Sequence, residues 1–124
     1  MPVAPPLTDD ELDAAFSALA DPTRRAILTR LSESDATVNE LAEPFALSLP
    51  AISKHLKVLE RTGLISRGRH AQFRPCHLEP RVLDGATEWI ERNRQVWTDR
   101  FDQLEQHLRT LQAARPSFTE GNQP

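Results

Sequence analysis

The sequence predicts a mainly α-helical chain with one small β-hairpin, and three observations carry this prediction. Four helix-start signals recur in the first half of the chain, at Thr8, Asp21, Thr37 and Ser48. Two short runs with strand character then flank a glycine-containing turn at residues 68–71. Apolar residues at helical spacing follow from about residue 80 to residue 114. The predicted order is four helices, the hairpin and one long helix.

The length and composition of the chain bound what it can be. Its 124 residues are enough for one ordinary domain. No run of about 18 apolar residues is present, so we expect no membrane span, and the first six residues lack the features of a signal peptide. Cys76 is the single cysteine, which excludes an internal disulfide and fits a reducing compartment. We therefore expect a cytoplasmic protein.

The charge of the chain is unevenly distributed. The formal net charge is −3, which by itself argues against a nucleic-acid partner. Between Lys54 and Arg74, however, six basic residues and one acidic residue give +5, so the remainder carries −8. A basic block on an acidic body is an electrostatic footprint for DNA, although such blocks are also found as solvated surface.

The first two helices have clear start signals. Residues 1–8 are proline-rich and predict a flexible tail, and Thr8 with Glu11 forms a capping box that begins a helix at residue 9. Asp21 precedes a proline, which favours the first turn of a second helix.

A short helix and a longer one follow. Thr37 and Glu40 form another capping box, and Pro44 ends this helix near Glu43 because the residue before proline avoids helical geometry. Ser48 caps the next helix, which runs to about Thr62 and ends at Gly63.

The hairpin and the last helix complete the order. We expect strands at residues 64–67 and 72–76, a helix over about 80–114, and a disordered tail at 115–124. This order is that of a winged helix-turn-helix over residues 9–114, with an additional helix at each end.

The helix from Ser48 to Thr62 is the predicted reading helix. On a helical wheel Ile52, Leu56 and Leu59 face one side, and a basic side lies opposite. Small residues at its start allow close approach to bases, and the lysines can reach phosphates or guanine edges. The residues predicted to contact DNA from this helix are Ser48, Pro50, Ala51, Ser53, Lys54, His55, Lys57 and Arg61.

Three of the predicted contacts have a second interpretation. His55 lies at the margin of the buried side, where a histidine is more often structural or in contact with phosphate than catalytic or metal-binding. Thr37 and Ser48 are first of all helix caps, and a cap beside DNA can also contact a phosphate. The predicted hairpin, or wing, adds further DNA contacts from Arg67, Arg69, His70 and Arg74. Considered without the neighbouring lysines, these residues would be interpreted as an exposed polar turn.

The long helix predicts a homodimer. About 35 residues form a rod of about 50 Å. Its apolar stripe could pack in part, with Trp89, or entirely on its own domain, but one small domain can hardly cover a rod of this length. Its apolar residues have coiled-coil spacing, and the first helix adds an apolar face of its own. The predicted interface consists of Leu12, Phe16, Leu19, Trp97, Phe101, Leu104, Leu108 and Leu111. Twofold pairing would place two reading helices about 34 Å apart, one turn of DNA.

Two motifs resemble the ArsR-type (arsenic-repressor-like) family of regulators. The first is residues 16–28, FSALADPTRRAIL, and the second is residues 49–59, LPAISKHLKVL, followed by Gly63-Leu64-Ile65. The resemblance covers about residues 12 to 110. It implies a homodimer that binds imperfect palindromes of double-stranded DNA and represses transcription until a signal releases it.

The metal sites of that family are not matched. In the arsenic-type site two cysteines follow a Glu-Leu pair, whereas Ala42-Glu43-Pro44 follows Glu40-Leu41 here. The zinc-type pattern on the last helix is also missing, since Asp84 precedes Gly85-Ala86 and His107 stands alone. The resemblance is therefore to the metal-independent subset, with no cofactor and with an inducer that the sequence does not name.

Three alternatives stay open at this point. Cys76 and His77 could belong to an unusual metal or thiol sensor, although two adjacent ligands do not complete a zinc site and no resolving cysteine exists. The chain could also be a winged-helix interaction module that does not bind DNA. An enzyme is not expected, because phosphate loops, nucleophile elbows and carboxylate–histidine clusters are missing from the sequence.

Overall fold

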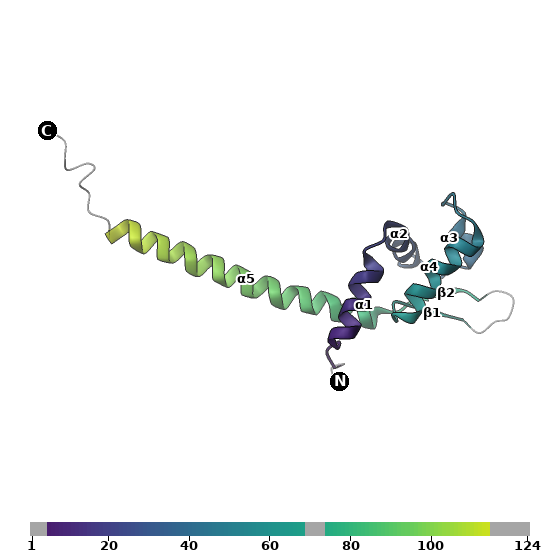
Figure 1. The fold of residues 1–124 in the computed structure, drawn as a ribbon, viewed down its shortest axis with the longest axis horizontal. Helices are drawn as coiled ribbons and strands as arrows, with labels where there is room; N and C mark the ends of the chain where they lie inside the picture. The colour runs from purple at the N-terminus through teal and green to yellow at the C-terminus, as the bar shows by residue number, and fades with distance from the viewer. Residues whose placement is uncertain (1–4, 69–73, 115–124) are drawn as a thin grey trace. The chain divides into compact units, whose positions relative to one another are not determined.

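The computed structural model describes residues 5–68 and 74–114. The elements occur in the predicted order and are labelled in Figure 1: α1 (Asp9–Leu19), α2 (Pro22–Leu31), α3 (Val38–Ala42), α4 (Leu49–Arg61), β1 (Ile65–Arg67), β2 (Cys76–Leu78) and α5 (Pro80–Ala114). The chain divides into two compact units, residues 1–88 and 89–124. The mainly helical fold class with one two-stranded hairpin is confirmed.

The first four helices begin at the predicted residues. The Thr8 hydroxyl accepts a hydrogen bond from Glu11 N at 3.1 Å, and the Glu11 carboxylate accepts one from Thr8 N at 3.0 Å. The same reciprocal pair joins Thr37 and Glu40 before α3. The N–H of Thr8 and the N–H of Thr37 hold the pKa values of the two glutamates below their usual value. Local capping chemistry therefore fixes where these helices start.

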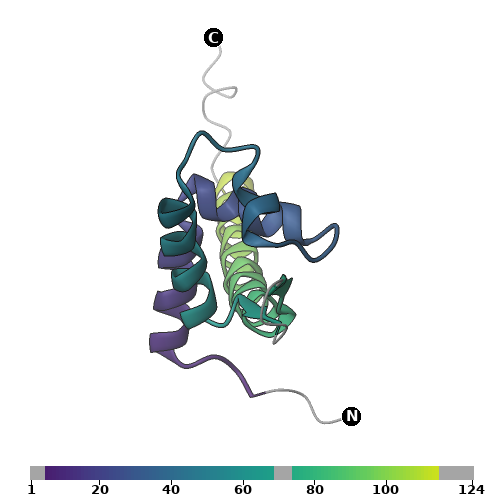
Figure 2. The same cartoon turned by 90° about the vertical axis from the view of Figure 1, so that its right-hand side faces the viewer.

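The core of the first unit lies between the helices and the hairpin. Helix α4 contacts α2, α3 and β1, and these elements gather in one cluster in Figure 2. The inward side of α4 is fully buried, as the wheel predicts, through Ile52, Leu56 and Leu59. Burial of three such side chains contributes about 1.5–3 kcal/mol each, so α4 has one strongly preferred rotation about its axis. Its opposite side is thereby turned outward.

Gly63 lets the chain turn directly from α4 into β1. Its φ of 79° lies in the left-handed region that glycine adopts without strain. A Cβ at this position would lie 3.1 Å from the Val82 side chain. The predicted role of Gly63 as the left-handed residue that ends α4 is confirmed.

The second strand differs from the prediction. We predicted it at residues 72–76, of which 72 and 73 lie outside the described residues. Strand β2 instead spans Cys76–Leu78 and pairs antiparallel with β1, with Arg67 opposite Cys76. Proline has no N–H to donate, and the Pro75 carbonyl instead accepts from Gly68 N at 2.9 Å. On its other edge Cys76 forms an isolated bridge with Ala36, with Cys76 N 2.7 Å from Ala36 O. This second partner, from the segment before α3, holds the strand later in the chain than local pattern suggests.

The N-terminal segment is partly held by the first unit. Residues 1–4 lie outside the described part, but Leu7 is half-buried against the core. Gly85 allows this contact, because a Cβ there would lie 2.5 Å from Leu7 Cγ. Arg81 of α5 also pairs with Glu11 of α1 at 3.0 Å.

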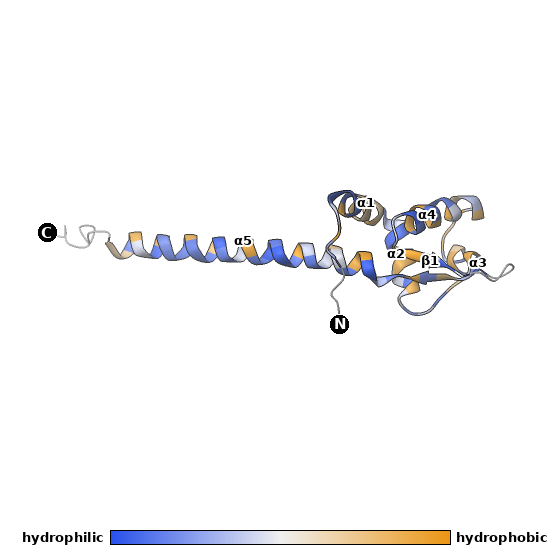
Figure 3. Ribbon diagram, turned by 90° about the horizontal axis from the view of Figure 1, so that it is seen from below, coloured by the Kyte–Doolittle hydropathy of each residue, from blue (hydrophilic) through white to orange (hydrophobic). Residues whose placement is uncertain are grey.

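The second unit, as far as it is described, is α5 from Trp89 onward. Figure 3 shows hydrophobic residues recurring along this helix between hydrophilic ones. Among the described residues, no helix has the length and apolar character that crossing a membrane requires.

Candidate nucleic-acid interface

The outward side of α4 presents a basic surface, which we call the α4 face and define as Pro50, Lys54, Lys57 and Arg61. All four residues are exposed, and Ala51 and Ser53 beside them are half-buried. None of the ion pairs found within residues 5–68 and 74–114 involves the three cations of this face. Their charge is therefore available to a partner such as phosphate.

The two helix caps, Thr37 and Ser48, differ in whether their hydroxyl groups can still contact DNA. The Thr37 hydroxyl accepts from Glu40 N and donates to the Glu40 carboxylate at 3.0 Å, so it is used within its own capping box. The nearby carboxylate would also repel a phosphate. Ser48 is exposed, and its hydroxyl accepts from Ala51 N at 3.3 Å. Of the two, Ser48 is the better candidate for a phosphate contact.

The His55 side chain points toward the start of α2 and does not belong to the exposed α4 face. Its Nδ1 lies 3.7 Å from the Asp21 carboxylate and 3.5 Å from Arg24 Nη1. Sequence reasoning missed Arg24 as a residue of this site. The only signal was its place in the Asp-Pro-Thr-Arg-Arg segment, which periodicity does not connect with α4.

The wing contributes two described arginines, while Arg69 and His70 lie outside the described residues. Arg74 is exposed, and its Nε donates to the Gly68 carbonyl at 3.2 Å. Arg67 is half-buried, and its Nε is buried without a hydrogen-bond partner in the described part of the chain. Arg67 thus packs at the base of the wing, and only part of its side chain is exposed for contact with DNA.

Cys76 and His77 lie in different surroundings. The Cys76 side chain is fully buried, and burial raises the pKa of its thiol, an effect that the nearby Arg67 partly offsets. The His77 ring instead faces outward and pairs with Asp35 at 2.8 Å. Across the described ranges, no three or more histidine, cysteine, aspartate or glutamate residues come together as a metal site would need.

The His77–Asp35 pair predicts one pH-dependent contribution to stability. The hydrogen bond that the His77 ring donates to the Asp35 carboxylate, together with the negative charge of Asp35, raises the pKa of His77 above its ordinary value of 6.5. A raised histidine pKa contributes stability that is fully present below pH 6.5 and is lost as the pH rises through the folded-state pKa. We expect the stability difference between wild type and His77→Gln, measured by urea unfolding, to shrink from pH 5.5 to pH 8. His107→Gln, on the exposed part of α5, is the control, and a wild-type-to-His77→Gln difference constant across this range would contradict the prediction.

The predicted dimer residues fall into two groups. On α1, Leu12 is buried within its own unit, and Phe16 and Leu19 are half-buried. On α5 the apolar residues are exposed, at 66% for Trp97 and 68% for Phe101. We call the exposed group the α5 seam; it consists of Trp97, Phe101, Leu104, Leu108 and Leu111.

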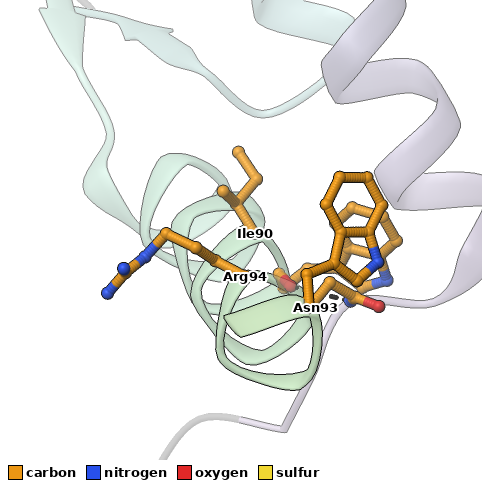
Figure 4. A pocket seen from close by; sticks show the side chains of 5 residues that line it. Ile90, Asn93 and Arg94 are labelled. Carbon is orange, nitrogen blue, oxygen red and sulfur yellow. Dashed lines mark hydrogen bonds between the residues drawn. The ribbon is translucent and has the colours of Figure 1, made fainter. Parts of the chain in front are cut away.

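A hollow on α5 lies at the start of this seam. It is lined by Trp89, Ile90, Asn93, Arg94 and Trp97, and Figure 4 shows Ile90, Asn93 and Arg94 projecting around the helix. The Asn93 amide donates to the Trp89 carbonyl at 2.9 Å, and Arg94 pairs with Glu91 at 2.9 Å. The Asn93 amide and the Arg94 guanidinium thus have partners within the helix, and Ile90, seven residues before Trp97, continues the apolar spacing of the seam toward the beginning of α5.

The fold and the α4 face together define a winged helix-turn-helix DNA-binding protein. Comparison with known proteins gives the same class: a model described as a helix-turn-helix domain matches residues 19–67. The transcriptional repressor SdpR of Bacillus subtilis is 39% identical over 79 residues, which cover 64% of this chain and 88% of SdpR.

Solved structures identify the family. A crystal structure of an ArsR family transcriptional regulator is similar with a TM-score of 0.70 and 38% identity, covering 76% of this chain and 97% of that one. An ArsR-like transcriptional regulator from Rhodococcus sp. RHA1 has a TM-score of 0.69 and 31% identity, covering 78% and 92%. The chain belongs to the ArsR family of winged helix-turn-helix regulators, and it is a DNA-binding transcriptional repressor.

Proposed function

We propose that the chain acts as a homodimer that binds a palindromic operator, with the α4 face of each copy in consecutive major grooves and the wing against the neighbouring backbone. The observation that carries this proposal is the division of α4 into a fully buried side and an opposite side with three exposed cations that form no ion pair with the described residues. A helix held in this way presents short residues at its start and long basic residues further on. The predicted contacts of Ser48, Ala51, Ser53 and Arg74, and those of Arg69 and His70 outside the described residues, stay part of the proposal. Thr37 and His55 do not, because their side chains are held by Glu40 and by Arg24 with Asp21.

Selection of bound duplexes from a random pool tests this function. We expect the purified protein to enrich a palindrome whose half-sites are about one helical turn apart. Recovery of sequences with no shared motif would contradict sequence-specific binding. A shared motif without twofold symmetry would contradict the dimeric arrangement.

The dimer is supported by the α5 seam. Five large apolar side chains, each about half exposed or more, recur at intervals of four, three, four and three residues. This is the spacing at which two helices pack against each other. A second copy of the same helix, related by a twofold axis, presents a matching seam.

The proposed repressor works without a metal switch and in the cytoplasm, where its DNA target is. We expect zinc, copper, nickel or arsenite to leave its affinity for the selected operator unchanged, as measured by fluorescence anisotropy. The described residues support this through the burial of Cys76 and the pairing of His77 with Asp35. A tenfold change with any of these ions would overturn the metal-independent assignment. The proposal includes no catalytic activity.

A further inference from the structure

The Arg24 guanidinium occupies the C-terminal end of α1. Its Nε donates to the Ala18 carbonyl at 2.8 Å, and its Nη2 donates to the Ser17 carbonyl at 3.0 Å. The last carbonyls of a helix lack partners within the helix and carry its partial negative charge. A planar cation with several fixed donors suits such a site. Two of its three nitrogens are therefore bound to α1.

The third nitrogen of Arg24 faces the reading helix. Its Nη1 lies 3.5 Å from Nδ1 of His55, which is in the middle of α4 and whose side chain is only 22% exposed. Asp21 completes the cluster, since its carboxylate accepts from Arg24 N at 2.9 Å and lies 3.7 Å from the same ring nitrogen. Three side chains thus join the α1–α2 junction to α4 through one atom of His55.

We propose that Arg24 is a positioning residue, which holds the reading helix at a fixed angle to α1 through His55 and Asp21. This inference rests on the DNA-reading role of α4. His55 directly follows Lys54 of the α4 face, so a displacement at His55 moves that face. Hydrogen bonds to base edges require accurate placement of the side chains that form them. Electrostatic attraction to phosphates is much less sensitive to that placement. The cluster therefore supports selectivity between sequences more than general affinity for DNA.

Arg24→Met against Arg25→Met tests this role. Arg25 is the matched control, because its Nη1 also donates to an α1 carbonyl, that of Leu19 at 2.8 Å, while its side chain is exposed. Affinity is measured for the selected operator and for a scrambled duplex of equal length, at several salt concentrations. For Arg24→Met we expect operator affinity to fall about tenfold or more, with the scrambled-duplex affinity and its salt slope unchanged. Arg25→Met leaves both affinities close to wild type.

Two results would overturn the inference. Equal effects of Arg24→Met and Arg25→Met would show that Arg24 acts only as a helix cap. A smaller salt slope for Arg24→Met on both duplexes would show that Arg24 contacts a phosphate. If the wild-type protein prefers no duplex at all, it is instead the proposed function that fails.

Variants of His55 give a second readout that does not depend on Arg24→Met folding. The side-chain amide of asparagine places a polar atom near the position of Nδ1, while that of glutamine reaches toward Nε2. We expect His55→Asn to keep operator affinity within about threefold and His55→Gln to lose as much as Arg24→Met. The double variant Arg24→Met/His55→Gln should be no weaker than either single variant, because all three remove the same contact. The positioning role of the Arg24–Asp21–His55 cluster would be contradicted if His55→Gln kept more operator affinity than His55→Asn. It would also be contradicted if the losses in the double variant were additive.

Discussion

Phe101→Asp converts the proposed dimer into monomers that no longer hold the operator. The side chain belongs to the α5 seam and is 68% exposed, so aspartate there costs little in the single copy. In a pair of seams, however, it places two carboxylates in an apolar contact, where burial of unpaired charge is strongly unfavourable. With the two half-sites bound independently, operator affinity should fall by a factor of about 100 to 10,000. Sedimentation velocity and fluorescence anisotropy on the same samples measure both effects, and Leu104→Asp should behave alike.

Gln106→Asp is the control for this prediction. It adds the same charge five residues, or about 1.4 turns, further along α5, on the side away from the seam, and Gln106 is exposed. We expect this variant to stay dimeric and to bind normally. A Phe101→Asp protein that is monomeric yet binds its operator tightly would contradict the dimeric model, and one that remains dimeric would remove the α5 seam from the interface.

Removal of both lysines from the α4 face is expected to have a comparable effect. In Lys54→Ala/Lys57→Ala four cations are lost per dimer, each from an exposed position without an ion pair in the described chain. We expect operator affinity to fall about 100-fold or more, because base-edge contacts contribute about 1–3 kcal/mol each. The slope of log affinity against log salt concentration should become shallower by about 2 to 4. Titrations between 50 and 200 mM salt measure both quantities.

Arg92→Ala/Arg109→Ala is the charge-matched control, since both arginines are exposed on α5. This variant carries the same net charge as the lysine variant but keeps the α4 face intact. If the two double variants weaken binding equally, total charge alone accounts for the affinity and α4 is not the reading helix. Circular dichroism of each variant should show the same helical content as the wild type.

The parts of the fold that could be predicted are those determined locally. A capping box needs only a threonine and a glutamate three residues apart, and both boxes are present with the expected hydrogen bonds. The buried side of α4 follows from 3.6-residue periodicity, and Gly63 at the end of this helix follows from the geometry of helix ends.

The parts that could not be predicted depend on residues far apart in the chain. The second strand is placed by Ala36, forty residues before Cys76, and no local pattern encodes that pairing. Likewise His55 lies at the margin of the helical wheel, where a turn toward DNA and a turn toward Asp21 look the same. Only the packing of α4 on α2 distinguishes the two directions.

The backbone bridge between Ala36 and Cys76 has a mechanical consequence. Its two hydrogen bonds, at 2.7 and 3.2 Å, tie the root of the hairpin to the residue just before the Thr37 cap. A force applied to the hairpin by a bent or widened duplex is thus transmitted to the beginning of α3 and not absorbed by a free hinge. In the proposed complex the hairpin and the start of α3 would therefore move together, and adaptation to an imperfect target would come from other parts of the molecule.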